Sequence, residues 1–327
     1  MNYRIRSSTP PSDNGESWER NTLRDVLLEA YREQRRARIW TAVWRGIGLL
    51  VFLSVLAAMF GSGQKEHMPL EAHDDHTAVI DLVGEIGGDE FTDHVGILRE
   101  GMQAAYENDN AKAIIIRANS PGGSPVVSNT AFEEIRRLKA EHKDIPVYVV
   151  AEDLCASGCY YIAAAADKIY ADPSSIVGSI GVVGSSFDAT GLMDKLGIKR
   201  RTRTAGSNKG MGDPFSPETP EQQAIWQQML DQIHAEFIKA VRTGRGNRLQ
   251  EKAFPDMFSG RVYTGLDAKK AGLVDGFGNV YSVARDVVKA PELVDYTPRE
   301  DEWTRLLGRR LGVEVKTQLA DWFKKLY

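Results

Sequence analysis

The sequence predicts an α/β domain built on a parallel sheet and preceded by a single transmembrane helix. Two observations support this fold class. From residue 78 onward, short apolar runs alternate with segments of helical periodicity, which is typical of parallel strands joined by right-handed helical crossovers. An apolar stretch also runs from Ile39 to Phe60, and as a helix it is about 33 Å long, enough for a bilayer core of about 30 Å.

The apolar stretch is expected to be an uncleaved signal-anchor over residues 39–61. Its one charged residue, Arg45, lies near the same end as Trp40 and Trp44, where a long side chain can reach the headgroups. Arginines precede the stretch and acidic residues predominate after it. The positive-inside rule therefore places residues 1–38 in the cytoplasm and the rest on the outer, periplasmic or extracytoplasmic, side of the cell membrane. The alternatives are a cleaved signal peptide, against which the long charged N-terminal segment argues, and a buried soluble helix.

The remaining chain divides by composition. A polar linker is expected at 62–76, a folded domain at 77–292, and an amphipathic C-terminal helix or tail at 293–327. The linker sequence "HDDH" (73–76) could bind a metal, although a solvated acidic linker is the simpler explanation. The net charge of −4 does not indicate nucleic-acid binding, and two cysteines are too few for an all-cysteine zinc site. No cofactor and no metal site are expected.

Periodicity predicts the elements of the folded domain in order. We expect strands at 78–84, 113–119, 145–152, 168–172 and 175–184, and helices at 91–107, 124–140, 157–166 and 219–242. The run "AIIIRAN" (113–119) is almost continuously apolar, which is typical of a strand buried on both faces. Residues 259–279 predict a strand, a helix that begins after Thr264 and ends at Gly272, and a further strand.

Ser157 and a glycine pair lie where two neighbouring strands are expected to end. Ser157 follows the strand at 145–152 and opens a helix of small residues, and "NSPGGSP" (119–125) follows the strand at 113–119. Ligands of parallel sheets bind beyond the carboxyl ends of the strands. The N–H groups of Gly123 and Gly158 could therefore form an oxyanion hole beside the Ser157 hydroxyl. The alternatives are that Ser157 only caps its helix and that the glycines only form a turn.

A serine nucleophile needs a base, and the histidines offer no clear candidate. None of the six lies in a turn suited to that role, so a Ser-His-Asp triad has no support. A lysine can serve if burial or a nearby cation keeps it neutral. Lys209 lies in the glycine-rich loop "AGSNKGMGDPFSP" (205–217), but a solvated charge would look the same in the sequence.

Four motifs together resemble one family. "NSPGG" (119–123), "ASG" followed by "GSIGVV" (156–183), "AGSNKGMGDPFSP" and "GRVYTGLDAKKAGLVDGFGN" (260–279) occur in the order found in the signal peptide peptidase A family, S49-type Ser-Lys membrane proteases, and the chain resembles its short, one-unit form. The resemblance implies that Ser157 is the nucleophile, Lys209 the general base and Ser179 a residue that orients the lysine. It implies that the "SPGG" glycines supply oxyanion amides, and that the fold is a Clp/crotonase-like spiral of parallel βαβ units.

The resemblance also implies function and assembly. We expect a membrane-anchored endopeptidase that degrades cleaved signal peptides or membrane-protein fragments, as a homo-oligomeric ring in which neighbouring subunits complete each active site. The alternatives are a regulatory membrane protease of a sibling Ser-Lys family, a crotonase-type acyl-CoA enzyme, and a non-catalytic membrane scaffold.

The two cysteines bracket Ser157. Cys155 and Cys159 are interpreted as small buried packing residues, since two cysteines four apart on one helix would form a strained disulfide. At position 159 the family usually has glycine, so Cys159 departs from the pattern.

Overall fold

The computed structural model describes residues 34–36, 38–54, 74–88 and 92–298, together with residues 24, 28 and 31. The chain forms two compact units, Met1–Glu66 and His67–Tyr327. Most of the linker expected at 62–76 and residues 299–327 of the expected C-terminal helix lie outside the described residues.

The N-terminal unit contains the apolar helix. Within the described residues, the helix Gln34–Ser54 is the one that is long and apolar enough to cross a membrane, with a mean hydropathy of 1.2. It begins a few residues before the predicted anchor, and the end predicted at residue 61 lies outside the described residues.

The described residues of the second unit form an eight-stranded sheet with strand order β6-β5-β3-β2-β1-β8, extended by β4 beside β3 and β7 beside β4. The strands are β1 (His76–Val83), β2 (Ala111–Ser120), β3 (Val147–Ala156), β4 (Lys168–Ala171), β5 (Ile176–Gly178), β6 (Val262–Thr264), β7 (Gly276–Phe277) and β8 (Leu293–Asp295). All pairs are parallel except β5 with β6, which confirms the predicted α/β class with a mostly parallel sheet.

The helices begin and end at local signals in the sequence. They are α2 (His94–Tyr106), α3 (Pro125–Glu141), α4 (Gly158–Ala163), α5 (Thr190–Lys195), α6 (Pro220–Arg245), α7 (Gly265–Ala271) and α8 (Val280–Ser282), with a 3₁₀ turn at Gly246–Arg248 and a π turn at Val283–Val288. Thr264 caps α7 by accepting from the Asp267 N–H, and Gly272 ends it at φ 78°. Both predicted ends of this helix are confirmed.

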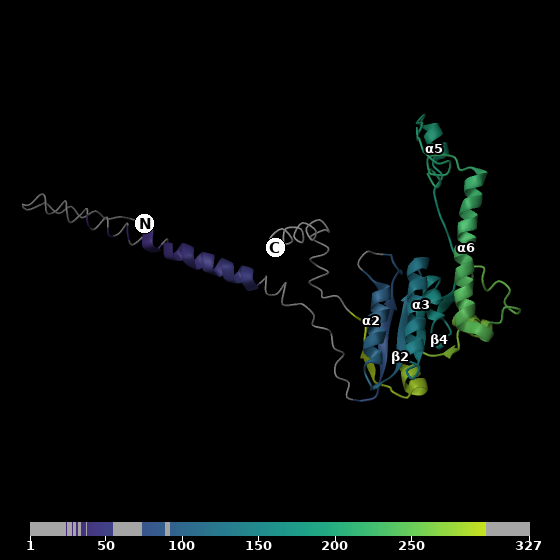
Figure 1. Ribbon diagram of the computed structural model, residues 1–327, viewed down its shortest axis with the longest axis horizontal. Coiled ribbons are helices and arrows are strands. Elements are labelled where there is room, and N and C mark those ends of the chain that lie inside the picture. The colour runs from purple at the N-terminus through teal and green to yellow at the C-terminus, as the bar shows by residue number, and fades with distance from the viewer. Residues whose placement is uncertain are drawn as a thin grey trace, which may run out of the picture. The chain divides into compact units, whose positions relative to one another are not determined.

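The core lies on both faces of the sheet. Ile114 and Ile116 of β2 pack in the cluster that α2 and α3 cover, and Ile115 packs in a second cluster with Val280 and Val283. All three isoleucines are fully buried, which confirms the strand predicted from the apolar run. Figure 1 shows α2 and α3 side by side over β2.

Most predicted boundaries shift by a few residues, and β3, predicted at 145–152, continues to Ala156. Three differences have a clear physical reason. β8 begins at Leu293, where the C-terminal helix or tail was expected, because this segment pairs with β1 and buries Val294. β1 begins at His76, which was expected to be the last residue of the linker. The His76 ring is buried, with its Nε2 2.9 Å from Tyr296 Oη, so this residue belongs to the folded domain. The strand expected at 175–184 ends at Gly178, since Gly178 and Ser179 adopt positive φ angles of 94° and 50°, which break extended pairing.

The helix α6 joins the sheet to an arm formed by residues 182–219. A buried ion pair fixes its C-terminal end: Arg245 Nη1 lies 2.6 Å from Asp275 Oδ2, next to β7. The opposite end of α6 extends beyond the sheet, and α5 lies at that outer end (Figure 1). The arm contacts α6 there, where the Asn208 amide donates to Glu221 Oε1 at 3.0 Å.

Candidate active site

Ser157 occupies the sharp turn between β3 and α4. Its backbone has φ 53° and ψ −123°, a conformation that costs a residue with a side chain about 1–3 kcal/mol. Two hydrogen bonds hold this turn: the Ser157 N–H donates to Gly178 O at 2.8 Å, and the Tyr161 N–H donates to Ser157 O at 3.0 Å. The side chain makes no capping hydrogen bond to α4, although Ser157 occupies the N-cap position. Helix capping therefore does not account for this serine.

The turn after β2 packs directly against the Ser157 turn. A Cβ atom on Gly122, which has φ 101°, would lie 2.6 Å from the Gly158 N and 2.7 Å from Ser157 Cβ. The Ile86 N–H donates to Gly122 O, and the Ser124 N–H donates to Ile86 O, both at 2.8 Å. These two hydrogen bonds hold Gly123, which lies between their residues. Only glycine at position 122 permits so close an approach of the two turns.

Two backbone N–H groups lie beside Ser157. A Cβ on Gly158 would lie 3.1 Å from Gly123 N, so the two glycines are adjacent in space. Within the described residues the Gly123 N–H has no hydrogen-bond acceptor, and Gly158, as the first residue of α4, has no acceptor inside its helix. The pair can therefore donate to an oxygen placed next to the Ser157 hydroxyl.

A cavity of about 470 Å³ opens at these two turns. Ser157, Gly123 and Gly158 line it, and Ser179, at φ 50° just after β5, lines it too. Apolar side chains form most of the remaining wall, namely Pro125, Tyr161, Val182, Val183, Ile233 and Phe237. Four of the five candidate residues thus surround one cavity with apolar walls.

Lys209, the fifth candidate, does not line this cavity. It is exposed on the arm, and the neighbouring Asn208 is bound to Glu221 in the first turn of α6. The cavity residues Ile233 and Phe237 lie further along the same helix, about 20 Å away at 1.5 Å per residue. A single chain therefore does not bring Lys209 to Ser157.

His234 is a residue of this site that the sequence did not identify. It lies on α6 and lines the cavity, and its Nε2 is 3.1 Å from Ile180 O. The helix could be predicted, but the face of it that points to Ser157 depends on packing between elements far apart in sequence. Tyr161 is the other titratable side chain in the wall, and burial raises its pKa to about 12, so it is neutral at physiological pH.

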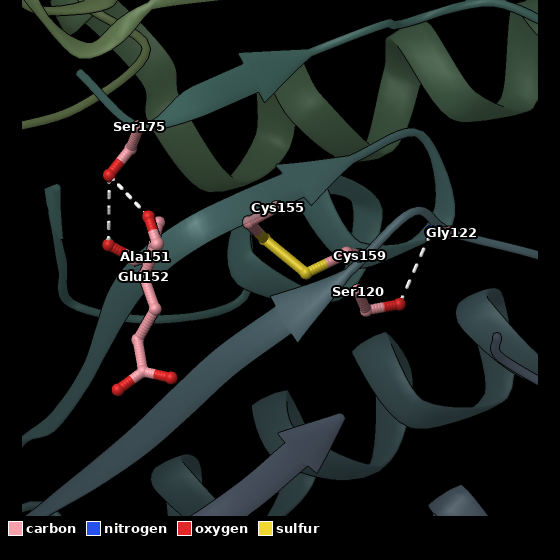
Figure 2. The surroundings of a disulfide bond; sticks show 7 residues. All are labelled: Ser120, Gly122, Ala151, Glu152, Cys155, Cys159 and Ser175. Atoms are coloured by element: carbon pink, nitrogen blue, oxygen red, sulfur yellow. Dashed lines mark hydrogen bonds between the residues drawn. A yellow bond between two sulfur atoms is a disulfide. The ribbon is translucent and has the colours of Figure 1, made fainter. Parts of the chain in front are cut away.

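The cysteines form a disulfide, so the expectation that no disulfide joins them was wrong, whereas their predicted burial is confirmed. Cys155 is on β3 and Cys159 is on α4, and the Ser157 turn brings their Cα atoms to 5.1 Å, within the range of disulfides. The prediction failed because it considered both residues on one helix face. Both residues are buried, and Figure 2 shows the bond beside Ser120 and Gly122.

In the part of the chain that the structure describes, no group of three or more His, Cys, Asp or Glu side chains could hold a metal ion. Of the "HDDH" residues, His76 is stacked on Tyr296, with ring centroids 5.8 Å apart.

Comparison with known proteins relates the chain to a protease family. The sequence profile of peptidase family S49 matches residues 139–293. A putative protease of Methanocaldococcus jannaschii, MJ0651, is 37% identical over 214 residues, which cover 64% of this chain and 67% of that protein. A putative signal peptide peptidase SppA of Enterococcus faecium is 31% identical over 68% of this chain and 62% of its own length.

A further relative is much longer than the matched region. The Na(+)/H(+) antiporter NhaA of Brucella melitensis is 47% identical over 184 residues, 56% of this chain, but the match spans only 25% of that protein. Among solved structures, the membrane-bound stomatin-specific protease 1510-N aligns over 69% of this chain and 99% of its own, with 17% identity and a TM-score of 0.44.

Proposed function

The chain belongs to peptidase family S49, and from this we propose that it is a membrane-anchored serine endopeptidase with a Ser157–Lys209 dyad. One observation carries the proposal. Ser157 is held at a positive φ on the wall of a cavity, with two backbone N–H groups beside it and its side chain not engaged in helix capping. The succession of parallel βαβ units is consistent with a Clp/crotonase-like fold.

The proposed reaction is peptide-bond hydrolysis in two steps. Neutral Lys209 takes the proton of the Ser157 hydroxyl while Oγ attacks the scissile carbonyl carbon. The N–H groups of Gly123 and Gly158 donate to the resulting oxyanion. The C–N bond breaks, the leaving amine takes the proton from the lysine, and water then hydrolyses the acyl-enzyme with Lys209 again as base.

The distance between Lys209 and Ser157 within one chain points to shared sites. Exposed apolar residues lie on the same arm, with Val183 and Phe187 each 88% exposed and Leu196 62% exposed. Such residues are typical of an interface between subunits. A ring of identical chains in which the arm of one subunit reaches the cavity of the next would bring Lys209 to Ser157, where Ser179 would orient it. Removal from water favours the neutral amine, which a base must have.

The cavity wall and the apolar helix support the proposed substrate and location. The wall is largely apolar, which suits extended apolar peptides such as cleaved signal peptides or fragments of membrane proteins. The helix Gln34–Ser54 would tether the domain beside the bilayer where such peptides lie, with the domain on the outer side of the membrane.

The dyad is tested with an acylating serine probe and a fluorogenic apolar peptide. We expect the wild-type protein to be labelled at Ser157 and to cleave the peptide, and Ser157→Ala to do neither. Lys209→Ala should lose both activities and remain folded by circular dichroism, while Lys199→Ala, an exposed lysine on the same arm, is the matched control and should retain them. Full activity in Lys209→Ala would exclude the dyad and leave a crotonase-type enzyme or a scaffold as the better explanation.

Shared sites are tested by co-expressing the two inactive variants. A mixed ring contains sites in which a Lys209→Ala subunit supplies Ser157 and its neighbour supplies Lys209. Random mixing should restore about a quarter of wild-type activity, because each site needs one subunit of each kind in the right order. A mixed ring as inactive as its parents would show that each chain builds its own site.

A further inference from the structure

The Cys155–Cys159 disulfide encloses the Ser157 turn. Cys155 is the penultimate residue of β3, and Cys159 is the second residue of α4, so the three residues between them, Ala156, Ser157 and Gly158, form a small covalent ring. These three residues include the hydroxyl and one of the two N–H groups that the proposed reaction uses.

One side of this ring is fixed in the sheet. Cys155 lies opposite Ser120 of β2 and opposite Val177 of β5, and it is 1% exposed. The Ser120 hydroxyl accepts from the Gly122 N–H at 3.2 Å (Figure 2). The residue paired with Cys155 in the sheet therefore also supports the glycine turn. Cys155 is therefore an immobile point next to both parts of the site.

The other side of the ring is weakly held by local structure. The helix α4 has only six residues, and helices this short are not stable by themselves. Ser157 at φ 53° gains from relaxing to an ordinary backbone conformation, and only the hydrogen bonds to Gly178 and Tyr161 described above oppose this within its own backbone. Burial of all six of its residues holds α4 in the core, and the covalent bond from the sheet to Cys159 adds a direct constraint against opening of the Ser157 turn.

We propose that Cys155 and Cys159 are positioning residues whose disulfide holds Ser157 and Gly158 in the conformation required for acyl transfer, so that the oxidised chain is the active form. The inference rests on the proposed function, since it assigns the disulfide to the same nucleophile. It also fits the proposed location of the domain outside the cytoplasm, where disulfides persist.

The first test removes the disulfide by substitution. Cys155→Ala, Cys159→Ala and the double variant should each lower kcat for the fluorogenic peptide about tenfold or more. Without the disulfide, the strain at Ser157 would reduce the fraction of molecules with the active turn conformation by about a factor of ten. The three losses should be equal, because each variant breaks the same bond. KM should stay within about twofold, since the cavity wall is unchanged.

The second test reduces the native disulfide. Tris(2-carboxyethyl)phosphine breaks the S–S bond, each sulfur gains an electron and a proton, and the phosphine becomes its oxide with oxygen from water. Wild-type kcat should fall to the level of the double variant, and reoxidation with oxidised glutathione should restore it. The double variant should not respond to either reagent. This measurement stands even if a substituted protein fails to fold.

A purely structural role predicts a different result. The disulfide would then raise the midpoint temperature of unfolding, and kcat measured at temperatures well below that midpoint would not change when the disulfide is removed. The matched control is Ile169→Val, a buried residue of β4, which should lower the thermal midpoint and leave kcat and the response to phosphine as in the wild type. Unchanged kcat in folded cysteine variants, or in fully reduced wild type, would overturn the positioning role. Absence of Ser157 labelling in the oxidised wild type would instead overturn the proposed function.

Discussion

Substitution of Gly122 by alanine should disable the Ser157 turn without touching the serine. The new Cβ would lie 2.6 Å from Gly158 N, 2.7 Å from Ser157 Cβ and 2.8 Å from Ala156 O, all closer than real Cβ contacts. Two of these atoms are backbone, so no side-chain rotation relieves the overlap. The two turns must separate, which moves the Ser157 hydroxyl and the Gly158 N–H away from Gly123.

The magnitude can be divided with a matched control. Alanine at a left-handed φ costs about 1–2 kcal/mol, and overpacking adds about 1–3 kcal/mol, so Gly122→Ala should lose about 2–5 kcal/mol of unfolding free energy. Gly84 also has a positive φ, 87° against 101° for Gly122, but a Cβ there has no atom within 4 Å. Gly84→Ala should therefore lose only about 1–2 kcal/mol.

Urea denaturation measures the stabilities of the two variants. Hydrolysis of the fluorogenic peptide measures their activity, without urea and at a temperature at which both variants are folded. We expect kcat of Gly122→Ala to fall at least about a hundredfold, since displacement by about 1 Å of a reacting group has that effect. Gly84→Ala should stay within about threefold of wild type. Equal losses of stability in the two variants, with activity of Gly122→Ala near that of wild type, would refute the packing of the two turns described here.

Two further predictions concern stability and assembly. Burial works to raise the pKa of Asp275, but the hydrogen bond and charge of Arg245 outweigh it and hold the pKa below the ordinary value. The stabilisation is thus present above the unfolded pKa of about 3.9 and is lost as the pH falls through the folded pKa. Asp275→Asn should lower the free energy of unfolding by about 3–5 kcal/mol at pH 7. In urea titrations, the variant should lose less stability than the wild type as the pH falls below about 4. An equal loss of stability in both proteins at low pH would contradict the ion pair. Phe187→Asp, at an 88% exposed position, should leave the stability of the isolated chain unchanged but reduce the mass of the assembly in light scattering, and an unchanged mass would argue against the arm as an interface.

The sequence alone determined the features that depend on neighbouring residues. The parallel α/β class follows from the alternation of apolar runs with helical segments. The limits of α7 follow from Thr264 and Gly272, because a cap is made within one turn of the chain. The junction at Ser157 and the turn at Gly122 and Gly123 were also predicted, since strand ends and glycine pairs are local signals. The motifs around them were enough to indicate the family.

Only the tertiary structure decided which distant residues meet. It shows His234 of α6 in the cavity with Ser157, and it leaves Lys209 on an arm about 20 Å further along that helix. It also pairs β8 with β1, at residues where the sequence predicted the start of a C-terminal helix or tail. The disulfide between Cys155 and Cys159 is the clearest case, because a spacing of four residues has one meaning on a helix and another across a strand-to-helix turn. Periodicity describes a residue's neighbours within one element, whereas these contacts depend on how separate elements pack against each other.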